Sequence, residues 1–262
     1  MSVTQEGSPA QDPAGPRLAL PPRRERAGAG WTWIAQGWRL FARAPLMWIL
    51  SILVWFVIAI VSNLVPFVGG LAFQAVNPAI AAGFVVACRS IELGGDFELE
   101  QLFAGFRTRF GSLLVVGLIV IGCWILIFLA FAGVVGFSIL GAILSGNAQL
   151  IVHDIVASAL TIALAGLIAL ALSVPLMAAF WFAPALIVMH GLSPVQAMKE
   201  SFVGCMRNFV PFLVWGIVMT VFAVLAAIPI GLGYLVWIPL TISSTYAAYR
   251  GIYTEGGTLE PA

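Results

Sequence analysis

Residues 45–64 read PLMWILSILVWFVIAIVSNL, a run of twenty residues without a charged side chain. A helix needs about 20 mostly apolar residues to cross the hydrocarbon core of a bilayer. Comparable runs follow at residues 67–88, 112–131, 155–188, 209–228 and 231–249, and the run at 112–131 can continue to residue 144. The sequence therefore predicts an all-α, polytopic membrane protein with about six transmembrane helices, paired as three hairpins.

The composition is that of a chain surrounded by lipid. Of 262 residues, 61% are hydrophobic and 9% are charged, whereas soluble domains carry about 25% charged residues. The net charge of +1 argues against a nucleic-acid surface. The predicted partners are the lipid bilayer and, beyond it, another membrane protein or a second copy of the chain.

The first residues differ in kind from the rest. Residues 1–29 hold five prolines and the basic run Arg23-Arg24-Glu25-Arg26, and no apolar segment follows a charged start as in a signal peptide. Such a composition cannot bury enough apolar surface to fold. We expect a disordered Pro/Arg-rich cytoplasmic tail at 1–29, a helical membrane domain at 30–253 and a short C-terminal tail at 254–262.

Basic residues mark one side of the bilayer. Every Lys and Arg lies before residue 45, between residues 89 and 109, at 199 and 207, or at 250, and the other three connections hold none. The positive-inside rule then predicts that both termini are cytoplasmic. Residues 111–190 could hold two spans or more, and four spans there would preserve the same charge pattern.

Each predicted hairpin follows a segment whose aromatic residues recur at helical spacing, which indicates an amphipathic cytoplasmic helix. The candidate interfacial anchors in these segments are Trp31, Trp38, Arg43, Phe106, Arg109, Phe202 and Arg207. A helix of this kind lies in the headgroup layer; the alternative is a small cytoplasmic bundle. Ser193 and Gln196 predict a capping box at the start of the third helix.

The three segments belong to a degenerate internal repeat, in which a proline stands in the second arm of each hairpin. These prolines are Pro78, Pro175 and Pro239. Arg89 and Arg250 each follow the first and the third of them by eleven residues. The repeat predicts three copies of one unit: amphipathic helix, span, short outer turn and proline-containing span.

Polar residues inside or beside the apolar runs are the candidate functional positions, because burying such groups in a membrane is costly. They are Gln74, Asn77, His153, Asp154 and His190. Gln74 and Asn77 beside Pro78 suit a transport path, or are satisfied by neighbouring helices. His153 and Asp154 supply too few ligands for zinc and also suit a loop, and His190 suits an interfacial anchor. We expect no catalytic, cofactor-binding or metal-binding residue and no cofactor.

Several short motifs carry a family resemblance. They are GWTWI at 30–34, GWRLF at 37–41, LFAGFR at 102–107, FAPAL at 182–186, AMKESF at 197–202 and RNFVPF at 207–212. With them the chain resembles an uncharacterised proteobacterial family of six-span inner-membrane proteins. It is more loosely similar to the membrane region of some glycerophosphodiester phosphodiesterases. The family resemblance implies the bacterial inner membrane and brings no catalytic residues, and the hydrolase domain of the looser relatives is absent from this sequence.

Three functions are compatible with the sequence. The leading hypothesis is a non-enzymatic accessory or scaffold component of a membrane assembly. The second is a transporter or channel-like protein for a small or lipidic solute, which a cavity containing Gln74 or Asn77 would favour. The third is an intramembrane enzyme acting on lipid, in which His190 or the His153–Asp154 pair would have to take part.

Overall fold

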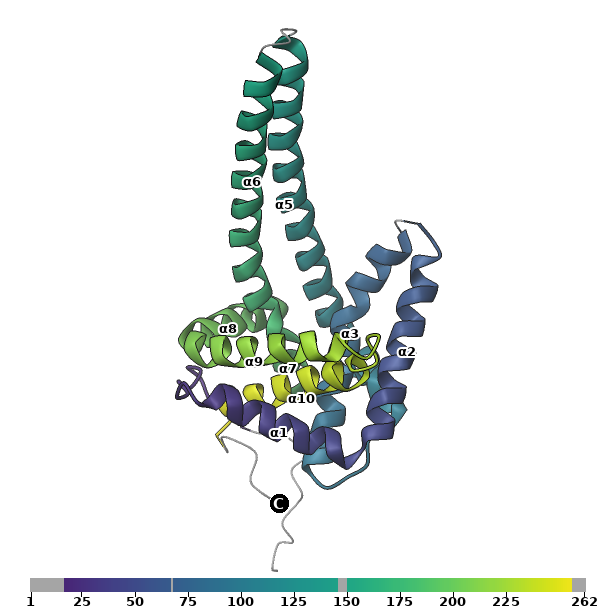
Figure 1. Cartoon of the computed structure of the whole chain (residues 1–262). Helices are drawn as coiled ribbons and strands as arrows, with labels where there is room; N and C mark the ends of the chain where they lie inside the picture. Colours follow the sequence, from purple (N-terminus) through teal and green to yellow (C-terminus); the bar gives the residue numbers. More distant parts are fainter. Residues whose placement is uncertain (1–16, 67, 146–149, 256–262) are drawn as a thin grey trace, which may run out of the picture.

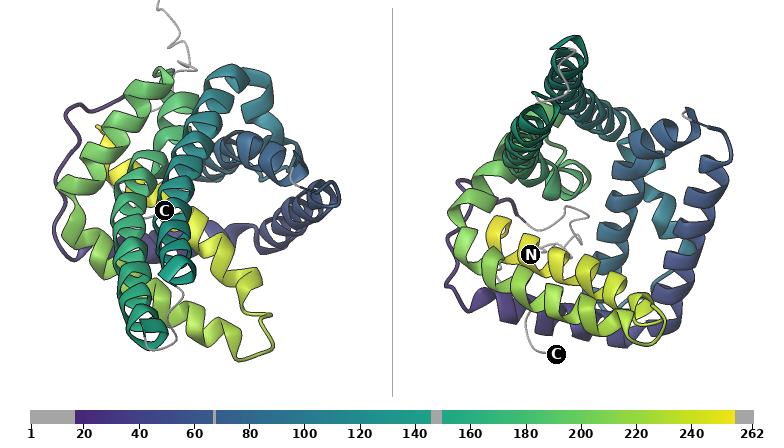
Figure 2. Two further views of the ribbon diagram at one scale, coloured as in Figure 1. Left: turned by 90° about the horizontal axis from the view of Figure 1, so that it is seen from above. Right: turned by 45° about the horizontal axis from the view of Figure 1, so that its top comes forward.

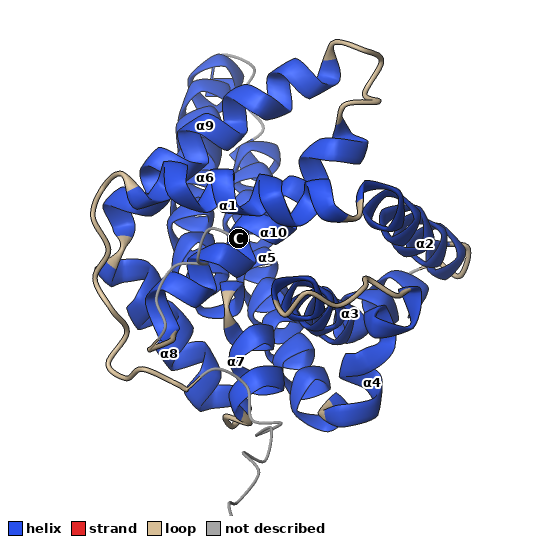
Figure 3. Cartoon of the chain, turned by 90° about the horizontal axis from the view of Figure 1, so that it is seen from below, coloured by secondary structure: helices blue, strands red, loops and turns tan. Residues whose placement is uncertain are grey.

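The computed structural model describes residues 17–66, 68–145 and 150–255. Every named element in these ranges is a helix, which confirms the all-α class (Figure 3). In chain order they are α1 (Ala29–Arg43), α2 (Pro45–Asn63), α3 (Val68–Glu92), the 3-10 helix η1 (Leu99–Phe103), α4 (Ala104–Thr108), α5 (Phe110–Ser145), α6 (Leu150–Trp181), α7 (Ala183–His190), α8 (Pro194–Arg207), α9 (Phe209–Ala227) and α10 (Tyr234–Tyr253).

Five helices of the described residues are long and apolar enough to cross a membrane. They comprise Pro45–Asn63, Val68–Glu92, Phe110–Phe137, Ala159–His190 and Phe209–Ala227. The sixth predicted run, 231–249, falls on α10, which is not among them. Its second half carries serines, tyrosines and Arg250, all buried in the protein. The count of six spans and the equivalence of three hairpins therefore stay predictions.

The helices form two unequal antiparallel pairs above a layer of crossing helices (Figure 1). The pair α5 and α6 is the longer: α5 has 36 residues, about 54 Å at 1.5 Å per residue, against a hydrocarbon core of about 30 Å. The described part of residues 111–190 thus holds two long helices followed by the short α7. The pair α2 and α3 is shorter, and α1, α9 and α10 lie side by side across the other end (Figures 1 and 2).

Close helix contacts place α10 at the centre of that layer. At Gly37 of α1, an added Cβ would lie 2.6 Å from the backbone nitrogen of Ser244 in α10. Gly117 of α5 similarly meets the backbone of Ala75 in α3. Glycine is needed at such points because two helix backbones come closer than any side chain allows.

The predicted amphipathic segments have different outcomes. The first and third are the helices α1 and α8, whereas the second is divided between η1 and α4. The predicted capping box at Ser193 is wrong, because its side chain makes no capping hydrogen bond at the start of α8. A capping box is formed instead by Glu98 and Gln101 at η1. There it satisfies donors that the first turn leaves open.

The segment before α1 is bound to the end of α10. The backbone nitrogens of Ala19 and Arg23 donate to the carbonyls of Tyr253 and Ile252 at 2.7 and 2.8 Å. The amide of Asn208 donates to the carbonyl of Arg23 at 2.9 Å. The part of the predicted tail from residue 17 onward therefore lies along the helices, whereas residues 1–16 and 256–262 lie outside the described residues.

Candidate functional site

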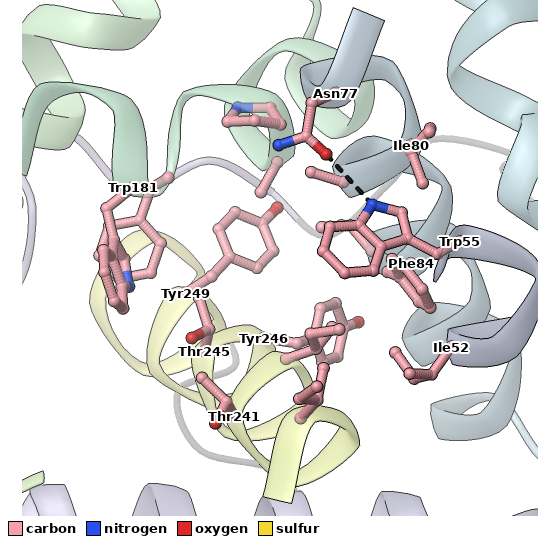
Figure 4. Close-up of a pocket in the computed structure, with 17 residues that line it drawn as sticks. Ile52, Trp55, Asn77, Ile80, Phe84, Trp181, Thr241, Thr245, Tyr246 and Tyr249 are labelled. Carbon is pink, nitrogen blue, oxygen red and sulfur yellow. Dashed lines mark hydrogen bonds between the residues drawn. The ribbon is translucent and has the colours of Figure 1, made fainter. Parts of the chain in front are cut away.

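A cavity of about 310 Å³ lies between α2, α3, the α6–α7 junction and α10 (Figure 4). Its walls are mainly aromatic and aliphatic, and they include Trp55, Phe84, Trp181, Tyr246 and Tyr249. Ligand pockets in proteins are of this size or larger and are likewise lined mostly by apolar side chains with a few polar groups. The cavity is therefore the candidate binding site.

Asn77 is the sequence-predicted residue that the structure places at the cavity. Its Oδ1 accepts a hydrogen bond from the indole nitrogen of Trp55 at 3.3 Å, which Figure 4 draws as a dashed line. That bond fixes the orientation of the amide, and its nitrogen makes no hydrogen bond with the described residues. Gln74, one helical turn earlier, is exposed and does not line the cavity.

Pro78 interrupts the backbone hydrogen bonding of α3 beside these two polar residues. Pro78 lacks the N–H that would bond the carbonyl of Gln74, so the helix loses one backbone hydrogen bond at this turn. In a membrane the exposed carbonyl must find another partner or an aqueous path. Gln74 and Asn77 therefore stand next to a gap in the backbone hydrogen bonding of an otherwise apolar helix. Of the two, only Asn77 lines the cavity.

Two tyrosines of α10 form the polar side of the cavity. The hydroxyl of Tyr246 donates to Oε2 of Glu92. The hydroxyl of Tyr249 lies 2.6 Å from Nε2 of His190. Because they are three residues apart, both rings lie on one face of the helix. His190 therefore reaches the cavity through Tyr249, a partnership that no sequence pattern indicated.

Behind these tyrosines, Glu92 joins α3 to α10. Its carboxylate binds Arg89 at 3.0 Å and Arg250 at 2.8 Å. The three side chains are 15, 23 and 11% exposed. The two arginines are those that the predicted repeat places at equivalent positions. Arg43 adds a bond of 3.0 Å to the carbonyl of Ile91. The end of α3 is thereby surrounded by arginines from its own turn, from α1 and from α10.

The remaining predicted residues are scattered. His153 and Asp154 belong to the start of α6, but their side chains lie outside the described residues. Arg109 lies beside Gly191 at the end of α7, and Arg207 donates to the carbonyl of Pro22 at 3.1 Å. Phe106 stacks on Phe110. In the described residues no three His, Cys, Asp or Glu side chains converge as a metal site.

Of the predicted aromatic anchors, three face outward. Trp31, Trp38 and Phe202 are exposed, whereas Trp33, on the same helix as the first two, is fully buried. Ile34 and Phe41, which recur with Trp31 and Trp38 at helical spacing, are buried. The buried face of α1 is therefore rotated toward Trp33 and Leu40, and the two exposed tryptophans lie at its edge.

Apolar helices of spanning length define a multi-pass integral membrane protein. The chain is 32% identical over 260 residues to the "Probable inner membrane protein" of Burkholderia thailandensis, in an alignment that covers 90% of this chain and 93% of that protein. The chain belongs to the family of that inner membrane protein. No family model matches the sequence, and no solved structure matches it. The looser likeness to glycerophosphodiester phosphodiesterases finds no support in these comparisons.

Proposed function

We propose that this integral inner-membrane protein binds a small lipidic solute in the cavity and carries it as a transporter, with both termini in the cytoplasm. The single observation that supports binding is the cavity itself, with Asn77 on its wall. A purely structural scaffold has no need of such a space. The distribution of Lys and Arg supports the orientation.

The lining limits the chemistry of the solute. An ion would lose its hydration among aromatic and aliphatic walls, at a cost of several kcal/mol. The cavity-lining polar groups that bond no described residue are the amide nitrogen of Asn77, the indole nitrogen of Trp181 and the hydroxyl of Thr245. The indole nitrogen is a donor only. The amide can only donate and the hydroxyl can do either. The solute is thus mainly apolar with an acceptor oxygen, such as an ester or a ketone.

We expect Asn77→Leu to weaken binding of such a solute roughly two- to tenfold, the usual worth of one hydrogen bond. The probe is a photoreactive monoacylglycerol, which is neutral and carries an ester. Peptides labelled on irradiation of the purified protein are identified by mass spectrometry. In the unsubstituted protein the label should be concentrated on the cavity-lining parts of α2, α3 and α10.

The matched control is Gln74→Leu, which makes the same change one turn away on the exposed face of α3. It should leave labelling unchanged, and both variants should elute as the unsubstituted protein does in size-exclusion chromatography. Equal labelling of the two variants, or a label spread evenly over the lipid-facing helices, would contradict the proposed site.

A second function, that of an accessory or scaffold subunit, is favoured by the pair α5 and α6. Its outward side chains include Phe128 and Phe137, which are among the most exposed large apolar residues. Gly133 and Gly136 of α5 have open space where a side chain would be. Small residues with open faces allow another transmembrane helix to approach closely.

If the accessory role holds, crosslinking in native membranes before purification should recover the chain together with another membrane protein. A bulky residue at the open face, as in Gly136→Trp, should reduce that recovery severalfold, whereas Trp124→Ala on the same helix should not. If the unsubstituted protein and both variants are each recovered alone, as a monomer, that result would argue strongly against the accessory role.

A further inference from the structure

A second apolar hollow lies on the other face of α10. It is a groove of about 670 Å³ between α1, α9 and α10. The α10 residues that line it include Val236 and Leu240, whereas those that line the cavity include Thr245 and Tyr249, each nine residues further along the helix. At 100° per residue these two sets point in nearly opposite directions. The groove is therefore a separate site, and its role is independent of the proposed transport function.

Two tryptophans of α1 form one wall of the groove. Trp31 and Trp38 are two helical turns apart and are 57 and 50% exposed. The remaining tryptophan of this helix, Trp33, is fully buried and packs on Phe212. The helix thus has one tryptophan that packs in the core and two tryptophans whose rings are available to a ligand in the groove. Tryptophan is enriched at the level of lipid headgroups because its ring is apolar and its N–H is polar.

One cation stands at the edge of this apolar wall. Arg39 is exposed, and of the described residues that line the groove it is the only charged one. It makes no hydrogen bond or ion pair with any described residue. Arg43, one turn further on, is bound to the carbonyl of Ile91. A guanidinium next to an apolar trough is complementary to an anionic group joined to a hydrocarbon chain, since arginine binds phosphate through paired hydrogen bonds.

We propose that this groove binds an anionic phospholipid, with the phosphate on Arg39 and one acyl chain between the two tryptophans of α1 and the α9–α10 pair. The charge of Arg39 selects a headgroup that contains a phosphate, and the long apolar wall of the groove selects an acyl chain. A lipid without a phosphate would leave the guanidinium without a partner. A helix of another protein could fill the groove, but it would also need an acidic residue opposite Arg39.

The test compares phosphatidylglycerol with diacylglycerol of identical acyl chains, which lacks the phosphate; each is added to the delipidated full-length protein in detergent and counted by native mass spectrometry. We expect phosphatidylglycerol to bind on the order of tenfold more tightly, the effect of one charge-assisted hydrogen bond. Arg39→Gln should remove this preference and leave the binding of diacylglycerol unchanged. The control Arg107→Gln removes an exposed arginine that is paired with Glu100 and should keep the preference.

The tryptophans are tested separately. Replacing both Trp31 and Trp38 by alanine should weaken the binding of both lipids severalfold. Trp124→Ala, which removes an exposed tryptophan of α5, should leave their binding unchanged. The side chain of Arg39 is exposed and makes no hydrogen bond or ion pair with a described residue, so its variant gives an answer even if the double tryptophan variant is unstable. Equal binding of the two lipids, or equal loss of preference in the Arg39 and Arg107 variants, overturns the proposal. So does a change in oligomeric state on removing the tryptophans without a change in lipid binding.

Discussion

Replacing Glu92 by glutamine is expected to lower the free energy of unfolding by about 3 kcal/mol, the lower end of the range for breaking a buried ion pair. The change leaves Arg89 and Arg250 close together without the carboxylate that separates them. The side chain of Arg250 is only 11% exposed, so water cannot replace the lost partner. The lower end of the range applies because the side chain of Arg89 is about a quarter exposed. Unfolding is followed by tryptophan fluorescence during titration of the micellar protein with sodium dodecyl sulfate.

The control is Glu100→Gln, which breaks the pair with Arg107 at the surface. Those side chains are 63 and 65% exposed, and exposed ion pairs contribute at most about 1 kcal/mol. A double-mutant cycle with Arg250→Met separates the pair from its parts, because the second change removes the uncompensated charge. If the Glu92→Gln and Glu100→Gln variants unfold at the same concentration of sodium dodecyl sulfate, the carboxylate of Glu92 does not hold α3 to α10.

The positions of the apolar helices could be predicted because a helix that crosses a bilayer needs about 20 consecutive, mostly apolar residues. The predicted run at 209–228 corresponds to α9, Phe209–Ala227, almost residue for residue. The run at 231–249 shows the limit of this approach. Hydropathy measures composition, and it cannot tell whether a helix faces lipid or protein. The neighbours of α10 are other helices, α1, α2, α3 and α9, so its serines and tyrosines are accommodated by hydrogen bonds and close packing.

The candidate site was predictable only where a local irregularity marked it. Asn77 beside Pro78 interrupts an apolar run, and that irregularity pointed to the cavity wall. The partnership of Tyr246 with Glu92 joins residues 154 positions apart, and no spacing rule along the chain can reveal it. A weaker signal was present: Arg89 and Arg250 occupy equivalent positions of the predicted repeat, and two cations near a membrane need a nearby acid. Glu92 is the acid one helical turn after Arg89.

The close approach of α1 and α10 at Gly37 leads to the second large expected effect. Leucine at this position should prevent α1 from packing, and we expect a loss of at least about 3 kcal/mol, beyond ordinary overpacking. A Cβ there would lie 2.6 Å from the nitrogen and 2.8 Å from the Cα of Ser244. Both are helix backbone atoms, which cannot rotate aside as a side chain can, so the two helices have to separate.

Thermal unfolding of the Gly37→Leu variant in detergent, followed by size-exclusion chromatography, measures this loss. Gly133→Leu is the matched control, since an added Cβ there meets nothing within 4 Å and leucine favours a helix by up to about 1 kcal/mol over glycine. Separation of α1 should also expose Trp33 and shift its fluorescence to longer wavelength. Because α10 carries Tyr246, Tyr249 and Arg250, the same variant should lose monoacylglycerol labelling of the cavity. A Gly37→Leu protein as stable as Gly133→Leu would mean that α1 is not what holds α10 in place.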